Sequence, residues 1–183
     1  MREEAFHAFF ERHHAGLSRL AYLLTGDSSA ADDVAADGLT EVWKHWDRVT
    51  AAADPVAYAR GIVANQSRNW VRRRARSRFV PLGPSRTAAA AGTEPGRPDA
   101  GARGRAGAHR GPAVAAILDV RAALRRLPHR RRACVVLRYA FDLSEREVAD
   151  ILDISVGAVK SQTSRGARQL AGMLQFDGWE VAR

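Results

Sequence analysis

The segment from Ser155 to Leu174 carries three cations, Lys160, Arg165 and Arg168, and contains no Asp or Glu. Its other polar side chains are mostly small hydroxyl groups, so the surface that they form would be short and positively charged. Ammonium and guanidinium groups donate hydrogen bonds to phosphates and to guanine, and short neighbours permit close approach to a DNA groove. The spacing predicts a DNA-reading helix, with a solvated basic helix as the alternative.

The residues that lead into this segment have the pattern of a helix-turn-helix. Ser144 and Glu147 match the S-x-x-E capping box that begins a helix. Asp153 tolerates the left-handed backbone of a tight turn better than most residues do, and Ser155 is the expected N-cap of the second helix. The candidates for DNA contact on the second helix are Ser155, Gly157, Lys160, Ser161, Ser164, Arg165 and Arg168.

The residues of this helix-turn-helix divide by face and by expected partner. The apolar residues Val148, Ile151 and Leu152 are expected to face inward, and so are Val156 and Val159. On the opposite face we expect base contacts from four of the candidates and a phosphate contact from the last, Arg168. The four are Lys160, Ser161, Ser164 and Arg165. The run 130–132 of three arginines is expected either to clamp the DNA backbone or to be a solvated helix end.

A second cationic helix is expected to begin at Pro55, since proline suits the first turn of a helix. Apolar residues, among them Val63 and Trp70, fall on one side of it. Available elsewhere on this helix are Arg60, Asn65, Arg68, Asn69, Arg72 and Arg73. Such a face can follow a phosphate backbone while its amides meet exposed bases. The alternative is an ordinary basic face above a core tryptophan.

The helix for which Ser28 or Ser29 is the expected N-cap is acidic instead. Its carboxylates would repel DNA, and they lie beside Trp43 and Trp46, which are effective anchors in protein interfaces. We therefore expect a protein partner with a basic surface; a merely solvated acidic face is the alternative. The candidates for this contact are Asp33, Asp37, Glu41 and Trp43.

The charge of the whole chain is consistent with two kinds of partner. The net charge of +9 and the pI near 11.0 favour a polyanion such as nucleic acid or an anionic membrane. The front is different, because residues 1–50 have five basic and nine acidic residues, a net charge of −4. No apolar run approaches the roughly 18 residues that cross a membrane, so membrane insertion is not expected. The sequence also shows no signal-peptide pattern, and we expect a cytoplasmic location. The single cysteine, Cys134, excludes an internal disulfide and is expected to be buried and inert.

Helical spacing runs through both ends of the chain, without the alternation that is typical of strands. Residues 81–112 are rich in Gly, Pro, Ala and Arg and have too few large apolar side chains to fold. We therefore expect an all-α protein of two small helical bundles joined by a flexible linker, with the helix-turn-helix in the second. The expected divisions are 1–80, the linker 81–112, 113–176 and a tail, 177–183.

Three stretches resemble one family: "AYLLTGDSSAADDVAADGLTEVWKHW", "AYARGIVANQSRNWVRRR" and "RLPHRRRACVVLRYAFDLSEREVADILDISVGAVKSQTSRGARQL". Together with the loose linker they are similar to extracytoplasmic-function (group 4) RNA polymerase sigma factors, especially the actinobacterial SigE-like branch. The resemblance covers both bundles. Its rear segment is the more specific part.

The resemblance implies partners for each surface. Sigma domain 2, residues 1–80, would bind the β′ clamp helices of the RNA polymerase core through Asp33 and Asp37 and read the minus-ten promoter element around Asn65. Residues 47–53 would be the loop that captures a flipped base. Sigma domain 4 would read the minus-thirty-five element with residues 155–168 and contact the β flap. An anti-sigma protein is a further candidate partner. The family's second helix usually has Gln before its acid, where this chain has Ala36, and the small residue after the acid is Gly38. Because glycine has low helix propensity, the polymerase contact would be weaker or would rely more on the two tryptophans.

The sequence disfavours other function classes. It contains no phosphate-binding loop of the form G-x-x-x-x-G-K-[ST], so the protein is not expected to melt DNA alone. One rival is a transcription regulator whose front senses a ligand or phosphoryl group, and another is a DNA enzyme such as a recombinase. We expect no enzyme activity, no cofactor and no metal, with His7, His13 and His14 as surface residues.

Overall fold

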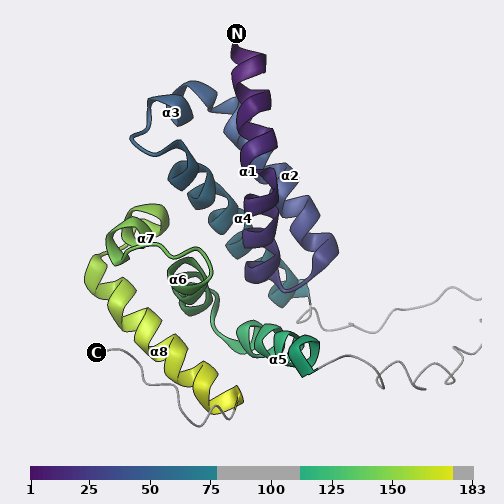
Figure 1. Ribbon diagram of the computed structural model, residues 1–183, viewed down its shortest axis with the longest axis vertical. Coiled ribbons are helices and arrows are strands. Elements are labelled where there is room, and N and C mark those ends of the chain that lie inside the picture. Colours follow the sequence, from purple (N-terminus) through teal and green to yellow (C-terminus); the bar gives the residue numbers. More distant parts are fainter. Residues whose placement is uncertain (78–111, 175–183) are drawn as a thin grey trace, which may run out of the picture.

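The computed structural model describes residues 1–77 and 112–174, and the regular structure in both ranges is entirely helical (Figure 1). The all-α prediction is therefore confirmed. Residues 81–111 of the expected linker and the expected tail lie outside the described residues. The helices are α1 (Arg2–Thr25), α2 (Ser28–Lys44), α3 (Trp46–Ala51), α4 (Pro55–Ser77), α5 (Pro112–Arg126), α6 (His129–Tyr139), α7 (Glu145–Leu152) and α8 (Val156–Leu174).

Local side-chain chemistry determines the junction between α1 and α2. The backbone of Gly26 is left-handed, with φ 74°, and this ends α1. The side chain of Asp27 then accepts a hydrogen bond from the Ala30 amide at 3.1 Å. The N-cap of α2 is therefore Asp27, and the prediction of Ser28 or Ser29 is wrong. A carboxylate at this position also offsets the positive end of the helix dipole.

The loop expected over residues 47–53 is mostly helical. α3 begins at Trp46, and the side chains of Trp46 and Val49 are buried, three residues apart on one face. Burial of this apolar pair stabilises a short helix that could not be predicted from the small residues around it. α4 begins at Pro55 as expected, because the Asp54 carboxylate accepts hydrogen bonds from the amides of Val56 and Ala57.

The first bundle packs α1, α2 and α4 around one apolar core. Leu17, Leu20 and Leu24 of α1 are fully buried there. Gly38 of α2 is also buried, and a Cβ atom on it would lie only 2.9 Å from a methyl group of Val63 on α4. The glycine therefore permits close helix packing, and this gain opposes its low helix propensity.

The second bundle is built around α6, whose central residues are buried against α8 and α7. Cys134 lies in this core as expected, and burial raises the pKa of its thiol to about 11. Val148 of α7 and Val159 of α8 are fully buried. Val156, the first residue of α8, was also expected to face inward but is 39% exposed.

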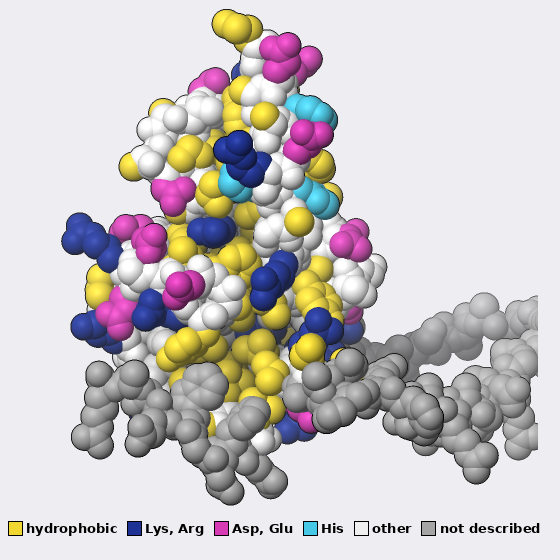
Figure 2. Space-filling view, viewed as in Figure 1, with side chains coloured by type: hydrophobic (Ala, Val, Ile, Leu, Met, Phe, Trp, Pro, Cys, Tyr) yellow, Lys and Arg dark blue, Asp and Glu magenta, His cyan; other side chains and the backbone are white. Residues whose placement is uncertain are grey.

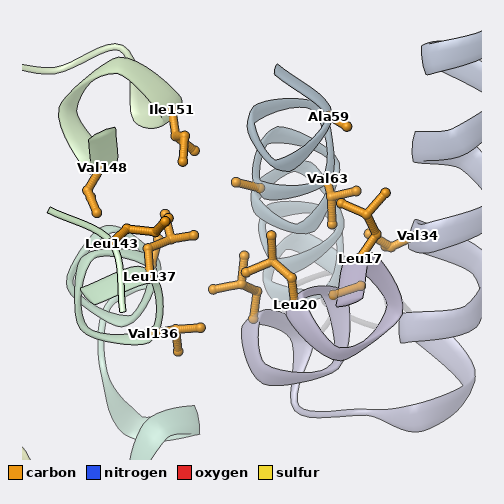
Figure 3. Close-up of a cluster of buried hydrophobic side chains, with 14 of the residues drawn as sticks. Leu17, Leu20, Val34, Ala59, Val63, Val136, Leu137, Leu143, Val148 and Ile151 are labelled. Carbon is orange, nitrogen blue, oxygen red and sulfur yellow. The ribbon is translucent and has the colours of Figure 1, made fainter. Parts of the chain in front are cut away.

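The two bundles pack directly against each other, which the sequence did not indicate. Their buried side chains form one continuous hydrophobic cluster, seen in Figure 3 with residues of α1 and α4 on one side and residues of α6 and α7 on the other. The interface joins α1 to α5 and α6, and α4 to α6 and α7. The cationic helix α4 thus lies next to the helix-turn-helix.

Candidate DNA and polymerase interfaces

The helix-turn-helix is assembled by the predicted capping residues. Ser144 Oγ accepts a hydrogen bond from the Glu147 amide at 3.2 Å, and the Ser144 amide donates to the Glu147 carboxylate at 2.6 Å. The hydrogen bonds from Ser144 also hold the pKa of the Glu147 carboxyl below its usual value. Asp153 ends α7 in the left-handed conformation, and Ser155 Oγ accepts from the Ala158 amide at 3.2 Å. These contacts fix the orientation of α8.

The predicted DNA face of α8 is open to solvent. Its long cations Lys160, Arg165 and Arg168 are exposed. Ser155 and Gly157 are exposed as well, while Ser161 and Ser164 are half-buried between the cations. Figure 2 shows Lys and Arg side chains projecting from the edge of the molecule where α7 and the start of α8 lie in Figure 1. Three of the seven predicted residues are thus exposed cations, and none of the seven is buried.

The polar residues of α4 lie in two settings. Asn69, Arg72 and Arg73 are exposed on the C-terminal half of the helix. Arg60 is half-buried, and its guanidinium lies 5.5 Å from the ring centre of Phe141, a cation–π distance. Trp70 is half-buried beside the core, beneath the guanidinium of Arg74 at 5.1 Å. Trp70 is therefore a structural residue that packs against the core.

The two remaining predicted residues of α4, Asn65 and Arg68, are exposed to solvent and line an open hollow of about 540 Å³ between the bundles. The opposite wall comes from α6 and α7 and includes His129 and Asp150. Burial, aided by the positive charges of Arg132 and Arg68, lowers the pKa of His129 to about 4. Of the six predicted minus-ten residues, the structure therefore leaves five exposed and only Arg60 half-buried.

The acidic face of α2 is exposed at Asp33 and Asp37. Glu41 is half-buried, and hydrogen bonds from His45 and Lys44, at 2.9 and 3.4 Å, lower the pKa of its carboxyl. These three carboxylates are spaced four residues apart and lie on one face of the helix.

The two tryptophans near this acidic face differ. Trp43 is half-buried, with its ring centre 5.0 Å from that of Phe6 and 4.9 Å from the guanidinium carbon of Arg2. Trp46 is only 6% exposed and packs edge-on against Phe6 and Phe9. The expectation that both tryptophans serve as anchors is wrong for Trp46, since this side chain is buried in the core against two aromatic rings.

The three arginines after Pro128 have separate environments. Arg130 is exposed, and Arg131 donates a hydrogen bond to the Gln169 side chain at 3.1 Å. Arg132 is only 4% exposed and donates to three backbone carbonyls, those of Leu24, Arg125 and Leu127. Neither predicted role applies to Arg132, because its charge is compensated by carbonyl oxygens at helix ends.

The histidines of α1 have aromatic neighbours. The rings of His13 and His14 lie 4.7 Å from those of Phe9 and Phe10, respectively. Over residues 1–77 and 112–174, His, Cys, Asp and Glu form no group of three or more that could hold a metal ion. No helix in these ranges is both long and apolar enough to span a membrane.

Comparison with known proteins matches the two ends of the chain to two regions of one family. The family model for sigma-70 region 2 matches residues 9–77, and the model for sigma-70 region 4 matches residues 117–170. The ECF RNA polymerase sigma factor SigL of Mycobacterium tuberculosis is 31% identical over 174 residues, which are 92% of this chain and 88% of the relative. SigM of the same organism is 30% identical over 175 residues, which are 94% of this chain and 78% of SigM.

The chain belongs to the ECF RNA polymerase sigma factors. Sigma factors direct promoter-specific transcription initiation and are not enzymes. The fold of this sigma factor is similar to that of RpoE from Bartonella quintana in complex with the anti-sigma factor NepR. The TM-score is 0.70 at 21% identity, over 96% of this chain and 99% of the other. CnrH, solved in complex with the cytosolic domain of CnrY, has a TM-score of 0.62 at 22% identity. The match covers 96% of this chain and 91% of CnrH.

Proposed function

We propose that three surfaces of this sigma factor have separate tasks in transcription initiation. The acidic face of α2, with Asp33, Asp37, Glu41 and Trp43, binds the β′ clamp helices of RNA polymerase core. The polar face of α4 reads the minus-ten element, and α8 reads the minus-thirty-five element. The observation that carries the proposal is the acid-free, solvent-exposed face of α8 in a capped helix-turn-helix.

The face of α8 has the dimensions and chemistry for the major groove. The first turns of a recognition helix meet base edges while later residues reach the backbone. Lys160, Ser161, Ser164 and Arg165 are the base-reading residues, and Arg168 binds a phosphate. Ser155 and Gly157 lie at the start of α8, where the open space around Gly157 permits close approach of a DNA strand.

The face of α4 suits single-stranded DNA. Arg72 and Arg73 are exposed and can track phosphates, while Asn65 and Asn69 offer amide donors and acceptors to unpaired bases. Arg60 and Arg68 extend the same surface toward the second bundle. Residues 47–53 cannot form the base-capturing loop as a whole, since most of them belong to α3 and only residues 52–54 separate α3 from α4.

The energy needed for melting requires the polymerase. Each base-pair step of DNA has on average about 1.4 kcal/mol of stacking energy, so opening several steps exceeds what the exposed arginines of one helix supply. The polymerase core therefore provides the further binding surface, and this chain provides recognition of two spaced elements. Their covalent connection makes the second DNA contact effectively intramolecular.

Finer assignments follow the resemblance. We further propose that the protein falls in the actinobacterial SigE-like branch, a placement that follows from the sequence resemblance alone. The proposed domain 2 spans residues 1–80 and the proposed domain 4 spans residues 113–176, with action in the cytoplasm. An anti-sigma protein is a proposed regulatory partner, as for the RpoE structure of similar fold.

The test is transcription from a library of randomised promoters with a mycobacterial RNA polymerase core and this protein. Sequencing the transcribed templates should recover two enriched elements about 25 base pairs apart, as the names minus-ten and minus-thirty-five require. Asn65→Ala should relax enrichment at the minus-ten element only, and Lys160→Ala at the minus-thirty-five element only. Absence of any enriched element, or melting of DNA by the free protein in a permanganate assay, would contradict the proposal.

A further inference from the structure

An apolar groove of about 260 Å³ lies where the C-terminal half of α8 packs beside α1, α5 and α6. Its lining side chains are hydrophobic apart from Arg19, and they include Leu23 of α1, Leu124 of α5 and Leu170 of α8. Figure 2 shows hydrophobic side chains gathered over the lower centre of the molecule, where α5, α6 and α8 lie in Figure 1.

The side chains of this groove keep part of their apolar surface open to solvent. Leu23, Val120 and Leu170 are half-buried, and Tyr139 is 52% exposed. Contiguous exposed apolar surface marks a site of interaction. The volume lies just below the range of roughly 300–1,000 Å³ for pockets that hold drug-sized molecules, so the groove suits one or two large side chains.

The chain itself supplies side chains of this kind directly after α8. Leu174, the last residue of α8, lies in the wall of the groove. The nine residues that follow it, 175–183, read QFDGWEVAR and include Phe176, Trp179 and Val181. An Asp-Gly pair at 177–178 is typical of a turn, which permits the chain to reverse direction. Five residues span at most about 18 Å, a sufficient reach for Trp179 to return to the groove.

The charges of the two parts are complementary. Asp177 and Glu180 flank Trp179 on either side in the sequence. At the groove, Arg19 is exposed and lines the wall, and the exposed Arg121 lines an adjoining hollow that shares Leu23 with the groove. A tryptophan entering the groove would therefore bring carboxylates toward guanidinium groups.

We propose that residues 175–183 dock in this groove, with the Trp179 ring inserted between α1, α5 and α8. A tether of a few residues gives an effective concentration on the order of millimolar, so a contact that is weak between separate molecules is populated within one chain. Lys160 and Arg165 do not line the groove. The docked segment therefore leaves the cations of α8 available for DNA.

Fluorine NMR of the full chain labelled with 5-fluorotryptophan tests the docking. The chain contains four tryptophans, and Trp179→Phe identifies the signal of Trp179 by its loss. A labelled synthetic peptide of residues 175–183 gives the undocked reference. In the full chain the Trp179 signal should be displaced from the peptide value, and it should shift less on transfer from H₂O to D₂O, because a docked ring is shielded from water.

A substitution in the groove wall should release the ring. Ala171→Gln adds a polar side chain to the wall without changing the charge, and the Trp179 signal should move to the peptide value. The matched control is Gly172→Gln, because Gly172 is the next residue, does not line the groove, and an added Cβ atom on it meets nothing within 4 Å. The signals of the other three tryptophans show whether each variant is folded.

Hydrogen exchange provides a second measurement that leaves the groove wall intact. Phe176→Ser/Trp179→Ser should make the backbone amides of residues 165–174 exchange at least threefold faster, since the end of α8 loses the segment that covers it. Gln175→Ser, a serine substitution in the same segment that removes no apolar side chain, should leave the exchange unchanged.

Other results overturn the proposal in separable ways. A Trp179 signal at the peptide value in the unmodified chain would show that the segment is not docked. A displaced signal that survives Ala171→Gln, with unchanged exchange in the double variant, would place Trp179 at another site. A displacement that disappears on dilution would show that the groove holds the segment of a second copy of the chain.

Discussion

The ammonium group of Lys160 lies 3.5 Å from the carboxylate of Glu145, which joins the first cation of α8 to the first turn of α7. Both groups are partly exposed to solvent, so the pair contributes at most about 1 kcal/mol and is readily exchanged. Glu145 therefore holds Lys160 near the start of the exposed face, and a DNA base or phosphate can replace the carboxylate.

Substitution of the α8 cations should separate base reading from phosphate binding. Lys160→Ala and Arg165→Ala are expected to reduce discrimination between minus-thirty-five sequences by about 1–3 kcal/mol each, the usual value for a lost base contact. Arg168→Ala should weaken binding to all sequences alike. Competition binding of a preferred and a scrambled duplex at fixed salt measures both effects. Equal losses on the two duplexes for all three variants would assign every cation to the backbone.

Charge reversal on α2 should weaken binding to RNA polymerase. In Asp33→Lys/Asp37→Lys, two exposed negative charges that face the proposed basic partner become repulsive, and we expect at least a tenfold loss of affinity for the core enzyme. Glu11→Lys on the exposed face of α1 is the control for a single reversal, and its affinity should change little. Core affinity is measured by fluorescence titration. An unchanged affinity in the double variant would exclude this face from the contact.

The two tryptophans should respond differently to truncation. Trp46→Ala removes a buried aromatic side chain from contact with Phe6 and Phe9, so the free energy of unfolding should fall by about 3–5 kcal/mol. Trp43→Ala should cost less stability, since this ring is half-buried, and should instead weaken polymerase binding. Urea unfolding and core affinity together distinguish the two roles. Equal stability losses would place Trp43 in the core beside Trp46.

Stability should depend on pH through His129. Its pKa is about 4 in the folded protein against an ordinary value of 6.5, so the unfolded chain takes up a proton first as the pH falls. The contribution of the neutral His129 side chain to the free energy of unfolding is about 3 kcal/mol. It is fully present above pH 6.5 and is lost as the pH falls from 6.5 to about 4. His129→Gln should show a smaller loss of unfolding free energy between pH 7.5 and 4.5 in urea titrations. An unchanged loss would mean that other groups cause the dependence.

Local chemistry was predictable from sequence wherever neighbouring residues determine it. The capping box of Ser144 and Glu147, the left-handed Asp153 and the cap at Ser155 are all confirmed, because each acts within four residues. α3 was not predicted because it has only two large apolar residues, Trp46 and Val49, which are too few for a helical periodicity to be recognised.

Contacts between distant segments were not predictable in the same way. The periodicity of α1 shows that residues such as Leu24 are buried, but it cannot distinguish a neighbour in the same bundle from one in the other. The charge of Arg132 suggested a surface position, whereas its partners are carbonyl groups, which leave no trace in side-chain composition. For the same reason the open hollow beside Asn65 and Arg68 has no sequence signal.

The guanidinium contacts at the end of α1 affect how the protein can be divided for experiments. A fragment limited to residues 1–80 would lose Arg125 and Arg132, and the carbonyls of Leu24 and Gly26 would have to bind water instead. The apolar side chains that meet the second bundle would become exposed as well. Such a fragment would fray at the end of α1 and self-associate, so weak DNA binding by it would reflect damage at the cut surface.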